Sequence, residues 1–258
     1  MKIGEPEKLL PTSNKFILRE LTQVAFIMTF LHLDCLKGVP KVLNMTFLNT
    51  VNMDSMEKIE FDQFEKLIQG LIDQKYGCCD DFMSLGTTIG LQSNIESLFK
   101  TGEMKSSGIG SKDNFHEDKT IRGDKINWIE DGSVNEFEIT YLTKIDRFIK
   151  HLNNSCYTSI KSYESHYASY EKNSFYKRHL DQFKNQKGRQ FSIILYLNQD
   201  WKEEDGGNLC LYLENGEQKK IAPFGGRMVF FKSDEMEHEV LPSFSRSRNS
   251  IAGWLKNE

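Results

Sequence analysis

The chain has 258 residues, which fits one large domain or one domain with a short extension. Its formal net charge is -4, so a broad basic face for nucleic acid is not expected. Hydrophobic residues make up 38% of the chain and aromatic residues 12%, which excludes a disordered or fibrous protein and provides for a buried core.

The first part of the chain differs from the rest. Residues 1–55 lack a clear long period and are interrupted by Pro6, Pro11 and Pro40. We therefore predict an N-terminal extension of unknown role over 1–55 and one folded domain over 56–258. A second hypothesis is that the natural chain starts at Met53 or Met56, which a native N-terminal peptide mapping upstream of Met53 would refute.

Three helices are expected in the first half of the domain. Apolar residues recur at helical spacing from Phe61 to Ile72, over 87–101 and from Tyr141 to Leu152. These stripes are typical of helix faces that pack on a core. A turn is predicted at Gly77, and a mobile loop over Glu103–Thr120, which is rich in Gly, Ser and charged residues.

After about residue 160 the apolar period changes to two, which is typical of strands. Turn signals with glycine separate the segments. Helices followed by short strands indicate an α+β protein, an antiparallel sandwich or barrel with helices on one sheet face. The predicted strands are His166–Glu171, Phe175–Asp181, Gln190–Asn198, Asn208–Leu213, Arg227–Lys232, His238–Phe244 and Asn249–Lys256.

Cysteine usage and hydropathy address the compartment. The five cysteines have no regular spacing, and Cys78 and Cys79 are adjacent, which argues against a disulfide framework or a zinc knuckle. A reducing cytoplasm is therefore expected. The longest apolar stretch, Val24–Leu33, is too short to span a bilayer and follows acidic residues, so neither a membrane partner nor export is expected.

A candidate metal site lies in the strand-rich half. His179 and Asp181 form a His-x-Asp sequence, and residues two apart on a strand point to the same face. His238, near the start of a later strand, can supply a second imidazole. Two histidines and one carboxylate suit non-haem Fe(II), although the same ligands could hold zinc. The alternative is a set of unrelated surface or core residues.

A candidate anion site lies nearby in the sequence. Arg248 follows His238 by ten residues and shares a strand face with Trp254. Its guanidinium can bind the far carboxylate of a dicarboxylic acid through charge-assisted hydrogen bonds. Tyr196 can donate to the same carboxylate, although a single such tyrosine is more often a core residue. Arg246 is a second candidate for the anchor, and strand phase favours Arg248.

Four segments together resemble the Fe(II)- and 2-oxoglutarate-dependent prolyl hydroxylases, most of all the hypoxia-inducible-factor prolyl hydroxylases and their bacterial relatives. The likeness runs from about Asp62 to Leu255. It implies a double-stranded β-helix, a jelly roll with flanking helices, and assigns 56–258 as the dioxygenase domain. The segments are 121–130 (IRGDKINWIE), 175–181 (FYKRHLD), 188–189 with 195–201 (LYLNQDW) and 206–207, and 238–242 (HEVLP) with Arg248 and Trp254.

The resemblance also implies residue roles. His179, Asp181 and His238 would bind iron. Arg248, assisted by Tyr196, would anchor the C5 carboxylate of 2-oxoglutarate. A further cosubstrate-side tyrosine is matched by Tyr170, whose spacing to His179 is one residue short. Substrate-side positions are matched by Tyr176, Arg189, Trp254, Arg122 and Asp124.

The activity implied is hydroxylation of a C–H bond, first of all in a prolyl residue of a protein or peptide, with release of succinate and CO2. Fe(II) would be the cofactor, 2-oxoglutarate and O2 the cosubstrates, and ascorbate the reductant. Two alternatives remain: a hydroxylase of a free amino acid or other small molecule, and a non-catalytic jelly-roll binding or sensor protein. Because no basic run is interleaved with aromatic residues, no nucleic-acid partner is expected.

The departures from the family concern the substrate. His238 to Arg248 is one residue longer than in the animal enzymes. The hydroxylated residue, oxygen sensing, oligomeric state and the role of 1–55 do not follow from the sequence.

Overall fold

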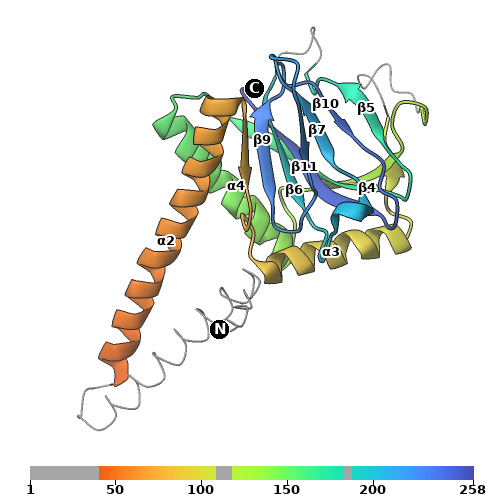
Figure 1. The fold of residues 1–258 in the computed structure, drawn as a ribbon. Coiled ribbons are helices and arrows are strands. Elements are labelled where there is room, and N and C mark those ends of the chain that lie inside the picture. Colours follow the sequence, from red (N-terminus) through yellow and green to blue (C-terminus); the bar gives the residue numbers. More distant parts are fainter. Residues whose placement is uncertain (1–40, 109–117, 183–187) are drawn as a thin grey trace, which may run out of the picture. The chain divides into compact units, whose positions relative to one another are not determined.

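The computed structural model describes residues 41–108, 118–182 and 188–258 (Figure 1). The chain divides into two compact units, Met1–Lys58 and Ile59–Glu258, and the second holds the sheets. The hypothesis that the natural chain starts at Met53 or Met56 is not tested by the structure. Of the residues before Met53, 1–40 lie outside the described residues. That hypothesis stays a prediction.

Helix α2 (Lys41–Gln74) begins well before the predicted helical pattern at Phe61. The stretch 41–69 contains neither proline nor glycine, so no residue type in it breaks a helix. The part before Phe61 also lacks a clear apolar period, which is why periodicity alone placed the helix start too late. Helix α2 therefore extends through 41–55, a region where the sequence pattern did not indicate a helix.

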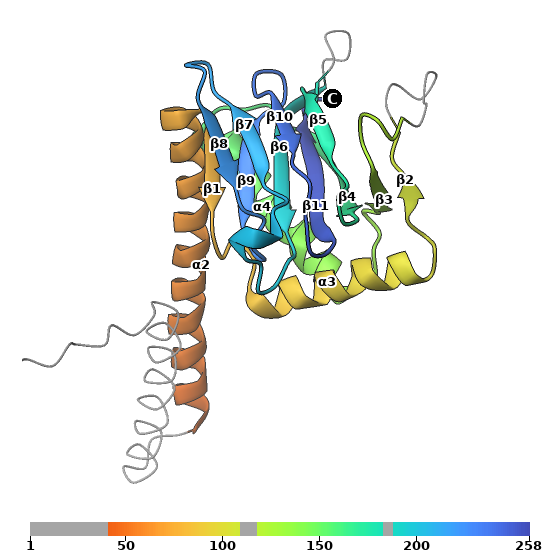
Figure 2. The ribbon, with the colours of Figure 1, turned by 45° about the vertical axis from the view of Figure 1, so that its right-hand side comes forward.

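Two antiparallel sheets form the body of the second unit (Figure 2). They are the two sheets of the predicted double-stranded β-helix, and the α+β class is confirmed. The larger sheet has the strand order β1 (Tyr76–Cys79), β9 (Met228–Lys232), β6 (Arg189–Tyr196), β11 (Arg248–Lys256), β4 (Ser162–Tyr170), β3 (Asp124–Ile129) and β2 (Lys105–Ser106). The smaller sheet has the order β5 (Tyr176–His179), β10 (His238–Val240), β7 (Leu209–Tyr212) and β8 (Gln218–Ile221).

The larger sheet carries helices on one face and the smaller sheet on the other (Figure 1). Helices α3 (Leu85–Lys100) and α4 (Glu136–Ser155) pack on the first face, where Phe148 meets Phe230. On the second face, Ile194 and Tyr196 pack with Leu209 of the smaller sheet. Successive strand residues therefore enter different layers. The prediction that the helices cover one sheet face is confirmed.

The predicted elements agree with the structure where periodicity is strong. The helices predicted at 87–101 and 141–152 correspond to α3 and α4, and the seven predicted strands overlap β4, β5, β6, β7, β9, β10 and β11. The strand predicted over His238–Phe244 ends at Val240, before Pro242, which cannot donate a ladder hydrogen bond.

Four short strands, β1, β2, β3 and β8, escape the sequence analysis. The first three lie in the first half of the domain, where the apolar spacing predicts helices, and β8 has the sequence QKKI with a single apolar residue. Strand β2 lies inside the predicted loop Glu103–Thr120. The central part of that loop, 109–117, is outside the described residues, so its mobility stays a prediction.

Gly77, predicted as a turn, instead lies within β1 and pairs with Phe230. The reversal occurs at Lys75, whose φ is 70°. A Cβ atom at Gly77 would lie 2.1 Å from the carbonyl oxygen of Leu67 in α2. Glycine is needed here because the backbone of the helix touches the backbone of the strand.

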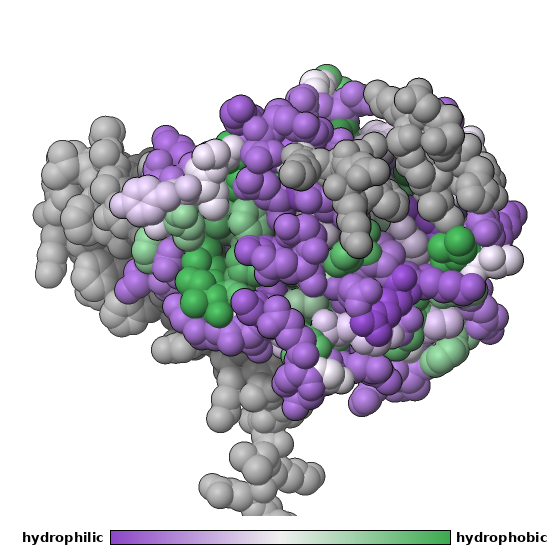
Figure 3. All heavy atoms as spheres, turned by 90° about the horizontal axis from the view of Figure 1, so that it is seen from above, coloured by the Kyte–Doolittle hydropathy of each residue, from purple (hydrophilic) through white to green (hydrophobic). Residues whose placement is uncertain are grey.

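Among the described residues, no helix combines the length and apolar content needed to cross a bilayer. Seen from above, the visible face is mainly hydrophilic, with hydrophobic side chains in separate small patches (Figure 3).

We expect Gly77→Ala to lower the free energy of unfolding by about 1–3 kcal/mol, because the added methyl group must displace backbone. Denaturant unfolding followed by circular dichroism measures the change. Gly86→Ala in α3 is the matched control, since no atom lies within 4 Å of a Cβ there and alanine favours a helix. Equal stability of Gly77→Ala and the wild type would contradict the close approach.

Candidate active site

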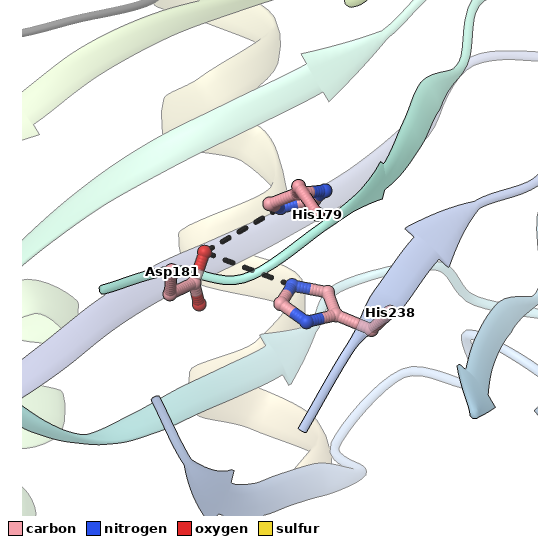
Figure 4. A group of neighbouring side chains, drawn as sticks. All are labelled: His179, Asp181 and His238. Carbon is pink, nitrogen blue, oxygen red and sulfur yellow. Dashed lines mark ion pairs between the residues drawn. The ribbon is translucent and has the colours of Figure 1, made fainter. Parts of the chain in front are cut away.

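Three potential metal ligands meet at the edge of the smaller sheet (Figure 4). The antiparallel register of β5 and β10 sets His179 opposite His238, and Asp181 follows β5 by two residues. Asp181 Oδ1 is 3.5 Å from His179 Nε2 and 3.7 Å from His238 Nε2. All three ligand atoms lie within 4.8 Å of one another. The sequence prediction that these residues converge agrees with this geometry.

Both imidazoles are oriented by their own strands. His179 Nδ1 is 2.7 Å from the carbonyl oxygen of Lys177, and His238 Nδ1 is 3.0 Å from that of Met236. A carbonyl oxygen only accepts, so each Nδ1 carries the proton and donates it. This tautomer leaves the lone pair of each Nε2 free on the side of Asp181, as a metal ligand requires.

The carboxylate of Asp181 accepts a hydrogen bond from one hydroxyl group, which a second hydroxyl group supports. Ser192 Oγ donates to Asp181 Oδ2 at 2.6 Å, and Ser233 Oγ lies 2.8 Å from Ser192 Oγ. Because the proton of Ser192 is committed to Asp181, Ser233 donates to Ser192. Both serines are buried. The sequence analysis did not predict these serines. Ser192 lies in β6 between Phe191 and Ile193, which face the helices, so strand alternation alone would have placed Ser192 on the opposite face.

The protonation states also suit a metal. Burial opposes ionisation of Asp181, but the adjacent His238 and His179 and the Ser192 hydroxyl outweigh it, so the pKa of Asp181 lies well below its usual range. Burial lowers the pKa of His238 to about 4. Near pH 7 the trio therefore presents a carboxylate and a neutral imidazole, which are the forms that bind metal ions.

Arg248 is a buried cation without an acid partner among the described residues. Its exposed fraction is 1%. Nε donates to the carbonyl oxygen of Gly207 at 3.0 Å, Nη1 lies 3.3 Å from Ser250 Oγ, and Nη2 has no partner. A buried charge left uncompensated is costly, so this arrangement fits an anion that completes it.

Two tyrosines surround the guanidinium of Arg248. Its central carbon is 4.9 Å from the ring centre of Tyr196 and 5.1 Å from that of Tyr170. Burial raises the pKa of Tyr196 to about 12, so the phenol stays protonated, and its hydroxyl has no partner. Tyr170 faces Arg248 in the β4–β11 register despite its shorter spacing to His179. The three side chains form a buried cluster in which Arg248 Nη2 and the Tyr196 hydroxyl have no hydrogen-bond partner among the described residues.

Arg246, the second candidate for the anchor, lies elsewhere. Its side chain is 41% exposed, and its Nη2 donates to the carbonyl oxygen of Gln199 at 2.7 Å. It also forms an ion pair with Asp205 at 3.5 Å. The preference for Arg248, based on strand phase, agrees with this placement.

A stack of side chains covers one side of the metal ligands. The ring of Tyr176 lies on the ring of His179 with centres 3.5 Å apart, and the guanidinium of Arg122 lies 4.2 Å from the Tyr176 ring. Arg122 Nη2 pairs with Asp124 at 2.6 Å. Burial disfavours the charge on Asp124, but the hydrogen bond from Arg122 outweighs this, and the pKa of Asp124 is lowered.

A second group of substrate-side candidates lies at the other end of β11. The guanidinium of Arg189 is 3.5 Å from the ring centre of Trp254 and pairs with Glu164 at 2.9 Å. Trp254 pairs across the sheet with Ser192, the residue that holds Asp181. The Arg189–Trp254 pair therefore borders the metal ligands on the side away from Arg248.

One buried histidine was left without a role by the sequence analysis. His166 in β4 is 3% exposed, and its Nδ1 has no partner among the described residues. Its ring centre is 4.9 Å from that of Trp128 and 5.3 Å from that of Trp254. The signal in the sequence was its even spacing from Tyr170, which puts both on one strand face.

These groups fit the iron and 2-oxoglutarate that the resemblance implies. The histidines offer two free Nε2 atoms and Asp181 a carboxylate, the donor set of a non-haem Fe(II) site. Arg248 Nη2 and the Tyr196 hydroxyl are the buried, unpartnered donors that a carboxylate would use.

Known proteins resemble the chain in sequence and in fold. Residues 165–256 match the model of the 2OG-Fe(II) oxygenase superfamily. A prolyl-4-hydroxylase from Pseudomonas putida is 30% identical with a TM-score of 0.69, and the match covers 76% of this chain and 99% of that one. The chain belongs to the 2OG-Fe(II) oxygenase superfamily. It is a prolyl-hydroxylase-like member, so its class is that of the 2-oxoglutarate-dependent dioxygenases.

Animal relatives agree with this membership. Human Egl nine homolog 1 is 32% identical over 189 residues, which cover 70% of this chain and 44% of the human protein. A Trichoplax adhaerens prolyl hydroxylase, solved with a hypoxia-inducible-factor oxygen degradation domain peptide, is 26% identical with a TM-score of 0.69; the match covers 79% of this chain and 92% of that one. The chain spans about half the length of the curated relatives it matches.

We expect Ser192→Ala in this oxygenase to weaken Fe(II) binding by roughly 10–100-fold, because the Asp181 carboxylate loses its hydrogen bond. Anaerobic titration with Fe(II), or with Co(II) followed by its visible absorption, measures the affinity. Ser93→Ala, on exposed α3 surface, is the control and should bind as the wild type does. Unchanged affinity in Ser192→Ala would show that the hydroxyl does not position the carboxylate.

A pH dependence of stability is expected from His166. Burial lowers its pKa from 6.5 to about 4, with Asp124, Arg122, Arg189 and Asp181 as the charged groups that act on the ring. As the pH falls from 6.5 to about 4, the unfolded chain binds a proton that the folded protein does not. This contribution therefore lowers the free energy of unfolding by up to about 1.4 kcal/mol per pH unit.

His166→Met removes this contribution. The advantage of the wild type over the variant should thus shrink as the pH falls through this window. Urea unfolding of the metal-free proteins from pH 7 to 4.5 measures the difference, and a difference independent of pH would contradict a neutral buried imidazole.

Proposed function

We propose that this protein is a prolyl hydroxylase that acts on a protein substrate and couples the reaction to conversion of 2-oxoglutarate and O2 into succinate and CO2. The observation that carries the proposal is the buried Arg248, which lacks an acid partner among the described residues. It lies in β11 of the larger sheet beside Tyr196, on the face that packs on the smaller sheet, whose strands β5 and β10 carry His179 and His238. Ascorbate as reductant and a reducing cytoplasm belong to the same proposal. The dioxygenase domain is assigned to 56–258, with 1–55 as an extension of unassigned role.

Relatives support the choice of a protein substrate. The Trichoplax adhaerens structure holds a peptide fragment, and the Pseudomonas putida protein is described as a prolyl-4-hydroxylase. Two groups of side chains lie on different sides of the metal ligands: Arg122 with Asp124 beside Tyr176, and Arg189 beside Trp254. An extended substrate could contact both groups at once. A peptide segment suits such spaced contacts better than a small molecule does.

In this proposal, Arg248 and Tyr196 bind the C5 carboxylate of 2-oxoglutarate. The free Nη2 and the phenol hydroxyl donate to its oxygens, which compensates the buried charge. The ring of Tyr170 lies against the guanidinium of Arg248 on the β4 side. These contacts fix the cosubstrate at one end, so that its other end faces the metal ligands.

His179, Asp181 and His238 would hold the iron through two imidazole nitrogens and one carboxylate oxygen. When bound, Fe(II) and 2-oxoglutarate supply oxidative decarboxylation coupled to oxygen insertion into a C–H bond. The protein orients the substrate: Tyr176 covers His179, and Trp254 with Arg189 borders the opposite side.

We expect Arg248→Ala to raise the KM for 2-oxoglutarate by about 10–100-fold, since charge-assisted hydrogen bonds contribute about 1.5–3 kcal/mol. Succinate formation at varied 2-oxoglutarate concentration measures this. Arg248→Lys keeps the charge but loses the bidentate geometry of the guanidinium, so its KM for 2-oxoglutarate should lie between those of the wild type and Arg248→Ala. Arg246→Ala is the matched control, because the Arg246 side chain lies at the surface and donates to the carbonyl oxygen of Gln199. An unchanged KM in Arg248→Ala would exclude the anchor.

The activity itself is tested by anaerobic loading with Fe(II) and 2-oxoglutarate, addition of oxygen, and mass spectrometry of a proteome for added oxygen. Hydroxylated prolyl residues that depend on His179 and Asp181 support the proposal. Oxidation of free amino acids or small molecules alone would make the protein-substrate part wrong. Normal 2-oxoglutarate decarboxylation by His179→Ala or Asp181→Ala would make the metal assignment wrong.

A further inference from the structure

Two unpartnered polar atoms lie together beside the metal ligands. His166 Nδ1 and Trp254 Nε1 are both buried and have no hydrogen-bond partner among the described residues. The two ring centres are 5.3 Å apart. An unsatisfied buried polar atom costs about 1–3 kcal/mol, and most such atoms in folded proteins find a partner. Two such atoms on neighbouring rings therefore point to a ligand that supplies the missing hydrogen bonds.

Strand register places this pair relative to the reaction site. His166 and Tyr170 share one face of β4 and are four residues apart, or about 13 Å along the strand. The ring of Tyr170 lies beside the guanidinium of Arg248, whereas His166 lies opposite Ala252 and next to Trp254. Trp254 in turn pairs with Ser192, which holds Asp181. The pair thus lies beyond the metal ligands from the cosubstrate anchor, where a substrate would approach.

Other roles account less well for His166. It is not part of the metal-ligand cluster found among the described residues, which consists of His179, Asp181 and His238. The indole rings of Trp128 and Trp254 pack against the imidazole, but neither forms a hydrogen bond with Nδ1. Its register partner in β11, Ala252, has no hydrogen-bonding side chain and so cannot satisfy Nδ1 either. A core histidine would instead be expected to satisfy both nitrogens.

The chemistry of the pair selects a neutral amide. Burial lowers the pKa of His166 to about 4, so the ring is neutral near pH 7 and offers one donor and one acceptor. Trp254 Nε1 only donates. The charged groups nearby, Arg189 and Glu164, are already paired with each other. A peptide main chain, with one N–H donor and one C=O acceptor per residue, matches this set, whereas a carboxylate would lack a free cation here.

We propose that His166, together with Trp254, binds a main-chain amide group of the substrate next to the hydroxylated residue and thereby determines specificity for peptides. This inference rests on the proposed function and extends it by naming a substrate-binding residue. Trp128 holds the imidazole from the other side and is a positioning residue.

The test uses the Fe(II)- and 2-oxoglutarate-loaded protein without oxygen and an array of blocked peptides with one central proline. Binding is followed by tryptophan fluorescence, since Trp128 and Trp254 flank His166. We expect His166→Met to bind the best peptides at least tenfold more weakly than the wild type. His166→Gln, which restores a donor and an acceptor, should recover part of the affinity. His151→Met on α4 is the control and should bind as the wild type does.

Single amide bonds of the best peptide are then replaced by esters, which removes one N–H at a time. One replacement should weaken binding to the wild type severalfold and leave binding to His166→Met unchanged. Equal losses in both proteins, equal binding of peptides to His166→Met and the wild type, or no peptide bound by the wild type would each overturn the inference.

Oxygen is admitted last and tests the proposed function separately. Peptides that bind through His166 but are never hydroxylated would refute the prolyl hydroxylase assignment and leave the amide site standing. Peptides that are hydroxylated with the same KM by His166→Met and the wild type would refute the amide site and leave the enzyme assignment standing.

Discussion

In β4, β6 and β11, alternate side chains face the helices and the smaller sheet, and this alternation determines which residue types each position can hold. Ile193, Leu195 and Ile251 face α3 and α4 in an apolar layer. The residues between them face the other sheet, where Ser192 and Arg248 are buried with polar contacts. A slip of one residue in any of these strands would exchange the two faces and bury the polar set among the helices.

The inner face is therefore ordered along the strand direction. Arg248 and Tyr196, with unpartnered donors, lie at one end, and His166 and Trp254, also with unpartnered atoms, lie toward the other. Asp181 is fixed between them through Ser192. Each unpartnered group reduces stability by about 1–3 kcal/mol. Two of these atoms belong to Arg248 and Tyr196, and two belong to His166 and Trp254. Two ligands, one on each side of a metal, would satisfy all four atoms.

Sequence reasoning succeeded where the determining factor was local. Arg248 opens β11, whereas Arg246 precedes the strand and donates to the carbonyl oxygen of Gln199. Because the two arginines are two residues apart, parity does not separate them, and the strand boundary does. Periodicity did not find β1 or β3, which lie in the first half of the domain, where the apolar spacing predicts helices and loops. Gly77 was read as a turn because its real constraint, the backbone of Leu67, comes from a helix that the sequence does not place beside it.

The polar contacts of the site were the least predictable part. The roles of Ser192 and His166 depend on which strands are neighbours: Ser192 reaches Asp181 from β6, and His166 meets Trp254 from β4. Neither pairing is visible in the spacing of the residues along the chain. Parity did place His166 on the face of Tyr170, but burial and the missing partner of Nδ1 are tertiary facts.

The three candidate ligands differ in how they are held. Each histidine donates to a carbonyl two residues earlier in the chain, so the ring orientation follows from β5 and β10 themselves. Asp181 lies beyond the end of β5 and depends on hydroxyl groups from β6 and from Ser233, which follows β9. The imidazoles are thus set by local backbone, whereas the carboxylate is set by contacts between strands. It follows that changes in sheet packing would act on the metal site through Asp181 first.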